Sequence, residues 1–384
     1  MATIMDYLAT EFATFDQKPL NEVDSLVFSQ LAMVRMAELV PLHEGHPSRG
    51  ARLLAALRRA FGREREAGAR FADLLRAERY ATMFTGLVPE RVKELLLAAA
   101  ASPRFRTVSI HDYASVFSEV ESTQFAAVSF TVPGRFTYLA FRGTDKYLAS
   151  WKENFDMAYA APVPAQEAAL RYAEEVARVS DEPLVLGGHS KGGNLAAYAA
   201  AKASPQVAER LVAVFDHDGP GFPEDLLGDA ERERLRKVLR KTVPRESLVG
   251  LLMDERGPYR VVESSARGLD QHSPFTWQIE QGADGTRLVA ADGLAPTARF
   301  TSEVLNAWIA EMDKGERRRA VNALFAAIEA SGAEDASDVL MGGAKAIGLL
   351  AEAARKTPPE ARDVIVDQMK SLAAIAAKKA LLRG

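Results

Sequence analysis

One short segment constrains the fold of this chain more than any other. The apolar run 183–186 is followed by the turn-like segment 188–192, which carries Ser190, and then by the alanine-rich stretch 193–203. This order predicts a strand, a sharp turn and a helix, which is the context of a nucleophile elbow. Gly188 and Gly192 flank the serine, and an elbow needs glycines there because the strained turn leaves no room for Cβ atoms.

The alternative is an ordinary glycine-rich connection between a strand and a helix. At an average glycine usage of about 7%, a bare Gly-x-Ser-x-Gly match occurs by chance in roughly one chain in ten of this length. The flanking strand and helix patterns make chance much less frequent and favour the elbow.

Strand and helix patterns alternate through the middle of the chain. The β-rich runs 125–132 and 136–141 are joined by Pro133-Gly134, which is typical of a hairpin. The alternation predicts an α/β fold, with a mostly parallel sheet covered by helices on both faces. Further helices are expected at 165–179, after the turn to about 203, and at 224–240, and further strands at 183–186, 211–215 and 258–264.

Helical patterns dominate both ends of the chain. We expect a helical N-terminal region over 1–105, interpreted as a candidate lid, an α/β-hydrolase core over 106–300, and C-terminal helices over 301–384. Residues 52–79 are predicted to be helical with an arginine-rich face, either a membrane or nucleic-acid surface or, as we favour, a solvated face that also carries acids. The tail 344–384 is either a partner-binding helix or, as we favour, one that packs on the body.

Composition excludes several functional classes. The 384 residues include no cysteine, so disulfides, thiolate metal sites and cysteine nucleophiles are excluded. A net charge of -4 argues against nucleic-acid binding. The first residues lack a signal-peptide pattern and no apolar run reaches about 18 residues, so we expect a cytoplasmic protein without a transmembrane span. Nothing in the sequence calls for a cofactor or a metal.

A serine nucleophile needs a base, and histidine titrates in the right range. The chain has six histidines. The order serine, acid, histidine found in α/β-hydrolases leaves His217 and His272. His272 is preferred because it lies late in the chain, in a loop between β-like segments. His189 lies inside the elbow and is expected to pack there.

The acid has two main candidates. Asp218 follows the strand after the elbow, at the sheet edge where open α/β sheets gather functional groups. Glu246 comes one strand-like step later. Asp218 is preferred, although its position also suits a cap of the Gly-Pro-Gly turn. Other acids, Asp216, Asp254 and Asp270, remain open.

The oxyanion hole requires two backbone N–H groups. One is expected from Lys191, directly after the nucleophile. The other is expected from Thr144, in the segment 141–145 at the end of an earlier strand, where Gly143 permits a tight turn.

The segments 141–144 and 188–193 together resemble the class 3 lipase branch of the α/β-hydrolases. The chain more closely resembles the Mbeg-like family of bacterial proteins of unknown function, which is related to those lipases. The likeness covers residues 1 to about 330 and is carried by Asp6-Tyr7-Leu8 with Phe15, Asn21-Glu22-Val23-Asp24, 124–127, 141–145, 150–155, 188–194, 218–222 and 271–275.

This resemblance implies an α/β-hydrolase fold, with Ser190 as nucleophile, His272 as base, and Thr144 and Lys191 around the oxyanion. Class 3 lipases carry their acid in an Asp-x-Val-Pro-like segment. The comparable stretch of this chain, 244–250, offers Glu246 or Ser247 instead of an aspartate. That departure is a second reason to prefer Asp218.

These observations predict a serine hydrolase of the lipase or esterase type that cleaves a carboxylic ester of a small molecule or lipid through an acyl-enzyme on Ser190. An intracellular thioesterase or acyltransferase, and a non-catalytic binding protein of the same fold, remain alternatives. Peripheral membrane contact is left open, and the oligomeric state is not predicted.

Overall fold

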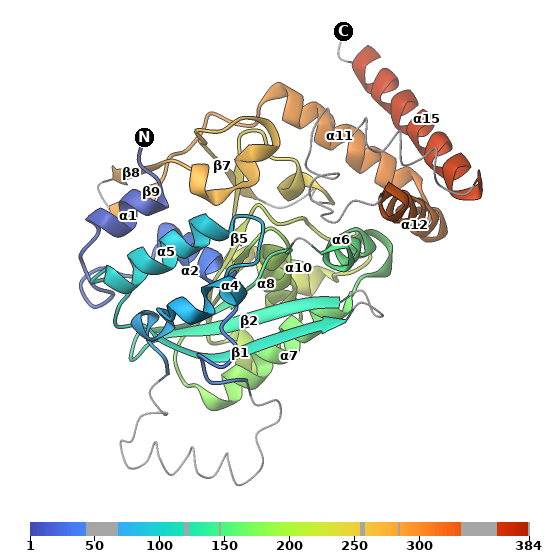
Figure 1. Ribbon diagram of the computed structural model, residues 1–384. Coiled ribbons are helices and arrows are strands. Elements are labelled where there is room, and N and C mark those ends of the chain that lie inside the picture. Colours follow the sequence, from blue (N-terminus) through green and yellow to red (C-terminus); the bar gives the residue numbers. More distant parts are fainter. Residues whose placement is uncertain are drawn as a thin grey trace.

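A seven-stranded sheet runs through the computed structural model (Figure 1). The structure describes residues 1–43, 68–118, 123–145, 147–253, 258–282, 285–331 and 359–382. The strands lie in chain order: β1 (Ser109–Ser118), β2 (Thr123–Val132), β3 (Phe136–Phe141), β4 (Leu184–His189), β5 (Leu211–His217), β6 (Leu239–Pro244) and β7 (Tyr259–Val262).

Strands β1, β2 and β3 pair antiparallel, and every pair from β3 to β7 is parallel. The expected hairpin joins β2 to β3, with Gly134 at φ 71° in its turn. The predicted α/β class with a mostly parallel sheet is therefore confirmed, and the topology is compatible with an α/β-hydrolase fold. The short hairpin of β8 (Ile279–Gly282) and β9 (Gly285–Leu288) forms a separate two-stranded sheet.

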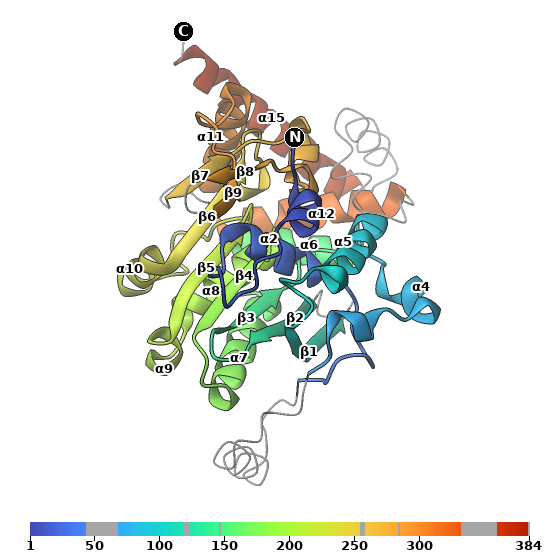
Figure 2. The same cartoon turned by 90° about the vertical axis from the view of Figure 1, so that its left-hand side faces the viewer.

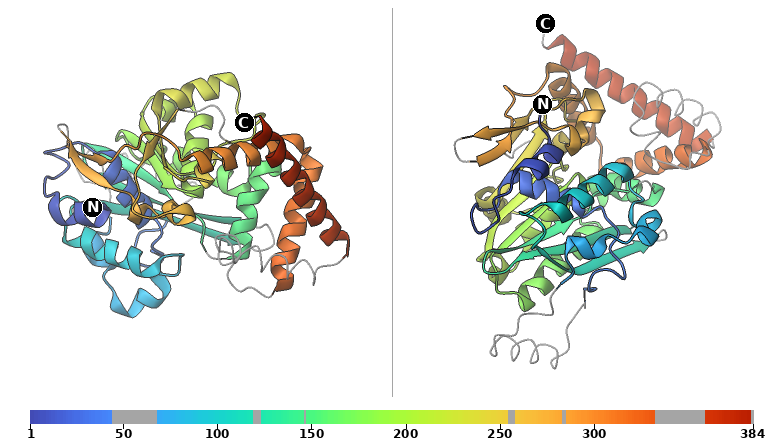
Figure 3. Two further views of the ribbon diagram at one scale, coloured as in Figure 1. Left: turned by 90° about the horizontal axis from the view of Figure 1, so that it is seen from above. Right: turned by 60° about the vertical axis from the view of Figure 1, so that its left-hand side comes forward.

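Both faces of the sheet are apolar and covered by helices (Figures 2 and 3). In β3, Tyr138 and Ala140 belong to one core cluster, whereas Leu139 and Phe141 belong to the other, as expected when successive side chains point to opposite faces. The first cluster includes α1 (Ile4–Thr10), α2 (Glu22–Leu31) and α5 (Pro89–Ala101); the second includes α6 (Leu148–Ala160), α7 (Pro164–Val179), α8 (Lys191–Lys202), α9 (Pro205–Ala208) and α10 (Asp229–Val238).

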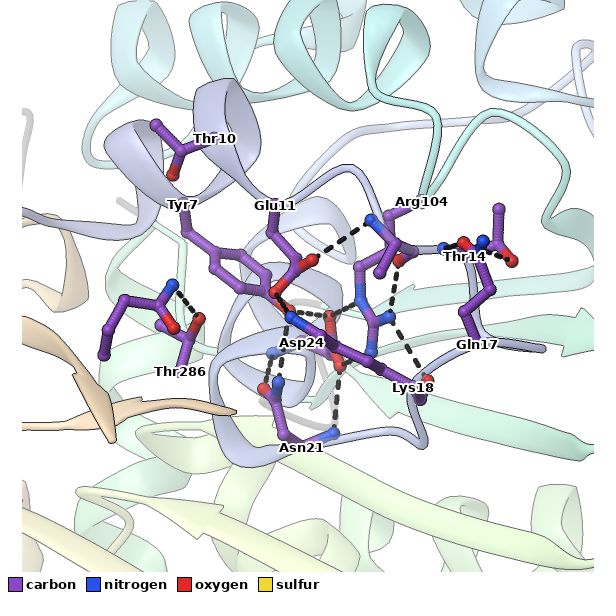
Figure 4. Close-up of polar contacts among 12 residues, drawn as sticks. Tyr7, Thr10, Glu11, Thr14, Gln17, Lys18, Asn21, Asp24, Arg104 and Thr286 are labelled. Carbon is purple, nitrogen blue, oxygen red and sulfur yellow. Dashed lines mark hydrogen bonds and ion pairs between the residues drawn. The ribbon is translucent and has the colours of Figure 1, made fainter. Parts of the chain in front are cut away.

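A buried ion pair joins helix α2 to the segment between α5 and β1 (Figure 4). Asp24 and Arg104 are both fully buried, with Nε and Nη2 of the arginine 2.7 and 2.6 Å from the two carboxylate oxygens. Tyr7 donates its hydroxyl to the same carboxylate at 2.8 Å. All but one of the residues of α2 are buried. Any lid contributed by the N-terminal region would therefore have to come from a part other than α2.

The predicted arginine-rich helix over 52–79 lies partly outside the described residues. In the described part the expectation is wrong: 68–79 holds only the 3₁₀ turns η1 (Phe71–Leu74) and η2 (Ala77–Arg79), before the short helix α4 (Tyr80–Met83). Ala69 pairs with Ile110 of β1 instead. The extended backbone that this pairing requires cannot also be helical.

The C-terminal helices pack on one another and on α6. Helix α11 (Pro296–Glu311) and helix α12 (Lys314–Ser331) both contact α15 (Pro359–Leu381), as Figure 3 shows. Phe325 of α12 meets Phe155 of α6, with ring centroids 5.5 Å apart. In the part of the chain that the structure describes, no helix has both the length and the apolar character that a membrane crossing requires.

Candidate active site

The elbow has the predicted form. Strand β4 ends at His189, helix α8 begins at Lys191, and Ser190 lies between them with φ 58° and ψ -129°. A non-glycine residue with this positive φ is strained, and such strain is typical of functional turns. The backbone N–H of Ser190 donates to the carbonyl of His217 at 2.9 Å, which fixes the turn against the end of β5.

The glycines around Ser190 are needed for steric reasons. A Cβ on Gly188 would lie 2.3 Å from the carbonyl carbon of Gly192. A Cβ on Gly192 would lie 2.1 Å from the carbonyl oxygen of Phe141. Both distances are far below van der Waals contact, so the close approach of β3, β4 and α8 requires glycine at both positions.

Asp218 and His272 form a close hydrogen-bonded pair. Nδ1 of His272 lies 2.6 Å from Oδ2 of Asp218, whose side chain is fully buried, while the imidazole is 16% exposed. A carboxylate only accepts, so Nδ1 carries a proton, and in the neutral imidazole Nε2 then holds the lone pair. This is the tautomer that a general base needs.

The other oxygen of Asp218 is also engaged. Ser247 donates its hydroxyl to Oδ1 at 2.5 Å, and the backbone N–H of Gly250 donates at 3.2 Å. The stretch 244–250, which also holds Glu246, thus supplies two hydrogen bonds to Asp218. The sequence drew attention to Ser247 but gave no sign of this partnership.

The other candidate acids have different partners. Glu246 accepts from the backbone N–H of Gly268, at the start of the 3₁₀ turn η4 (Gly268–His272), and so supports the turn that carries His272. Asp216 accepts from the N–H of Gly219 at 2.8 Å. Asp270 is exposed, and Asp254 lies outside the described residues.

His217 is a buried structural histidine. Its Nε2 lies 2.9 Å from the hydroxyl of Ser25 and its Nδ1 lies 2.8 Å from that of Thr242. Burial, and to a lesser extent Arg260, lowers its pKa to about 3, so the ring is neutral. Both nitrogens are occupied, which leaves His272 as the available base of the two.

His189 packs against the base. The His189 and His272 rings have centroids 4.5 Å apart, and Nε2 of His189 donates to the carbonyl of His272 at 2.7 Å. Burial, followed by the neighbouring His272, holds the pKa of His189 well below its usual value. A neutral His189 can therefore pack against the base without repelling its protonated form.

Ser190 and His272 lie at the same edge of the sheet. His189 contacts His272 and immediately precedes Ser190. Asp218, the partner of His272, directly follows His217, whose carbonyl accepts from the Ser190 N–H. Within the described ranges no hydrogen bond joins the Ser190 hydroxyl to the imidazole. Catalytic hydrogen bonds commonly tighten only when substrate binds.

The loop after β3 lies against the elbow. A Cβ on Gly143 would be 3.0 Å from the carbonyl oxygen of His189 and 3.9 Å from the Cβ of Ser190. Thr144 is buried, and its hydroxyl accepts from Asn154 of α6 at 2.6 Å. Lys191 is the first residue of α8, so its backbone N–H has no acceptor within the helix and is available to an anion.

A cavity of about 380 Å³ lies beside α10 and α11. Its walls include Phe222, Leu235 and Ile309, but neither Ser190 nor His272. The cavity is therefore separate from the candidate active site.

A family model described as Mbeg1-like matches residues 99–326, which include Ser190, Asp218 and His272. No curated protein matches the chain. The matched range spans more than half of the sequence, so this chain belongs to the Mbeg1-like family, and the predicted resemblance to the Mbeg-like family is confirmed over these residues.

Proposed function

We propose that this Mbeg1-like protein is a serine hydrolase of the lipase or esterase type, which cleaves a carboxylic ester through an acyl-enzyme on Ser190. The observation that carries the proposal is the 2.6 Å hydrogen bond between His272 and the buried Asp218, at the sheet edge that also holds the strained Ser190. Structural histidines are usually bonded on both nitrogens, whereas no described residue is hydrogen-bonded to Nε2 of His272, which leaves this atom for a proton from a nucleophile.

In the proposed reaction, Ser190 Oγ attacks the ester carbonyl while His272 Nε2 takes its proton. Asp218 holds the imidazole in the required tautomer and stabilises the imidazolium. His272 then returns the proton to the departing alcohol, which leaves an acyl group on Ser190. Water deprotonated by His272 cleaves that ester, releases the carboxylic acid and restores the hydroxyl.

The negative charge that develops on the carbonyl oxygen needs fixed donors. We assign these to the backbone N–H groups of Lys191 and Thr144. The position of Lys191 at the start of α8 supports its part, since a helix N-terminus favours negative charge. Gly143, which directly precedes Thr144, lies close to Ser190, and this proximity supports Thr144 as the second donor.

The substrate class in this proposal is a small-molecule or lipid carboxylic ester in the cytoplasm. The resemblance to class 3 lipases supports an acyl ester over an amide or a phosphoester. The chemistry requires neither a cofactor nor a metal.

The test is hydrolysis of p-nitrophenyl esters with acyl chains of two to sixteen carbons. The wild type is expected to exceed Ser190→Ala by roughly 10³-fold or more in kcat/KM, because the variant retains the fold but lacks the nucleophile. Acyl-CoA and an acceptor alcohol, assayed in parallel, separate an esterase from a thioesterase or an acyltransferase. Equal rates for the two proteins on every substrate would contradict the proposal.

A further inference from the structure

A buried ion pair lies directly behind the elbow. Lys191 follows Ser190, yet its side chain is only 1% exposed and its Nζ pairs with Glu153 of α6, which is 2% exposed. Nζ also donates to the backbone carbonyl of Gln124 at 2.6 Å. Burying a lysine and a glutamate carries a large desolvation cost, and apolar residues of similar size often replace such a pair without loss of stability. A contribution to stability therefore does not explain why a buried ion pair occupies this position.

Glu153 is held from several sides. Its Oε2 accepts from the backbone N–H of Gln124 at 2.9 Å as well as from Lys191, and its Oε1 accepts from the N–H of Ala165 at 3.1 Å. These bonds tie the start of β2, helix α6 and the start of α7 to one carboxylate. The position of the Lys191 ammonium is therefore fixed relative to the sheet.

The next residue of α6 contacts the second oxyanion candidate. Asn154 donates to the Thr144 hydroxyl at 2.6 Å. Glu153 and Asn154, which are adjacent in α6, thus bond to Lys191 and Thr144. These are the two residues whose backbone N–H groups form the oxyanion hole in the proposed function.

We propose that Glu153 is a positioning residue, which fixes the Lys191 side chain and thereby the direction of the Lys191 backbone N–H toward the oxyanion. The inference rests on the proposed function. Its physical basis is that a charge-assisted hydrogen bond has a defined direction, whereas an apolar contact tolerates rotation. Oxyanion stabilisation depends on donors that are in place before charge develops.

The test removes both charges together, in the double variant Glu153→Gln/Lys191→Met. This substitution avoids an unpaired buried charge and nearly preserves volume. Three quantities are measured per folded molecule: kcat and KM for p-nitrophenyl butyrate, and the affinity of an aliphatic trifluoromethyl ketone, which forms an oxyanion when serine attacks it.

Loss of a whole oxyanion donor costs about 10²- to 10³-fold in kcat, so a misdirected donor is expected to cost roughly tenfold or more. We expect ketone affinity to fall by a similar factor and KM to change less than about twofold, since substrate in its ground state carries no oxyanion. A purely structural role would instead lower the fraction of folded protein and leave kcat per folded molecule unchanged.

The same helix offers a matched control. Lys202, at the other end of α8, pairs with Glu231 at 2.9 Å, and both are partly exposed. The variant Lys202→Met/Glu231→Gln is expected to keep wild-type kcat, KM and ketone affinity. Wild-type values in the Glu153→Gln/Lys191→Met variant, or equal losses in both variants, would overturn the positioning role.

An activity-independent measurement separates this inference from the proposed function. Amide hydrogen exchange at Lys191 is expected to be faster in the Glu153→Gln/Lys191→Met variant than in the wild type and unchanged in the control variant. An unchanged rate in both variants would overturn the positioning role. A wild type that hydrolyses no ester would contradict the proposed function, and with it the role of this amide in catalysis.

Discussion

Asp218 lies in the left-handed backbone region, at φ 55°, directly after β5. Its backbone N–H donates to Thr242 at 2.8 Å, so the residue is anchored to β6 as well as to β5. With one carboxylate oxygen on His272 and the other on Ser247 and Gly250, it cannot rotate without breaking several bonds. This constraint orients the imidazole.

We predict that Asp218→Asn lowers kcat by about 10⁴-fold, because an amide at this position favours the wrong histidine tautomer. Glu246→Gln is the matched control. It replaces a carboxylate that accepts a backbone N–H near His272 but does not touch the ring, and should cost less than about tenfold. Steady-state kinetics on the best p-nitrophenyl ester decide between them. A larger loss in Glu246→Gln would reassign the acid.

Much of the candidate site could be predicted from particular residues. The turn that holds Ser190 follows from the strand and helix patterns around it, and the position of Asp218 follows from its place at a strand end. The sequence left Glu246 beside Asp218 as a candidate acid, because the hydrogen bond from Gly268 to Glu246 depends on how the segment 263–272 folds back. The contacts of Ser247 with Asp218 and of His189 with His272 are equally non-local and leave no sequence pattern.

Among the helices, strands and turns, the elbow leaves the least space for added side-chain atoms. Strands β3 and β4 are parallel neighbours, and α8 begins so close to them that Gly192 touches the backbone of Phe141. The geometry of the turn at Ser190 is therefore maintained by contacts between backbones. Side-chain repacking cannot relieve a change there.

We predict that Gly192→Ala destabilises the protein by about 1–3 kcal/mol, because its Cβ would overlap the carbonyl of Phe141. Urea denaturation measures the free energy of unfolding. Gly228→Ala provides the comparison: there the nearest atom is 3.9 Å from the new Cβ, and φ is -76°. Equal stability of Gly192→Ala and the wild type would show that the elbow has room for a Cβ at position 192.

Elements with strong local patterns were predictable, and elements defined by pairing were not. The hairpin of β2 and β3 and helix α7 follow from alternation and from helical periodicity. In contrast, residues 68–79 carry helix-forming residues, yet Ala69 bonds to Ile110 across the edge of the sheet. Tertiary pairing outweighed local propensity there, as it often does at sheet edges.

In the whole molecule, the N-terminal region and the sheet share one core. The bond between Ser25 of α2 and His217 of β5 joins the two parts, and Tyr138 of β3 lies 2.7 Å from the same serine hydroxyl. The Arg104–Asp24 pair holds α2 against the segment before β1, within the N-terminal region itself. Global stability should therefore respond to the protonation of His217.

The direction of that response follows from its pKa. The folded value is about 3 and the value in the unfolded chain is near 6.5, so between these pH values only the unfolded chain binds the proton. The stability contribution is complete above pH 6.5 and is lost as the pH falls toward 3. At about 1.4 kcal/mol per pH unit, the wild type should lose roughly 2 kcal/mol from this group between pH 6.5 and 5.

Urea denaturation of the wild type and of His217→Gln at both pH values isolates this contribution, since the other titrating groups are common to both proteins. The variant should be less stable at neutral pH and should lose less stability on acidification. Parallel losses in the two proteins would mean that His217 is not held neutral in the fold.

The most direct test of the central claim is the reaction of the protein with a fluorophosphonate, which phosphonylates serines activated by a neighbouring base. We predict that intact-mass and peptide analysis of the wild type finds a single adduct, located on Ser190. We also predict no adduct on Ser190→Ala and strongly slowed labelling of His272→Ala. An unlabelled wild type, or equal labelling of Ser190→Ala, would contradict the account.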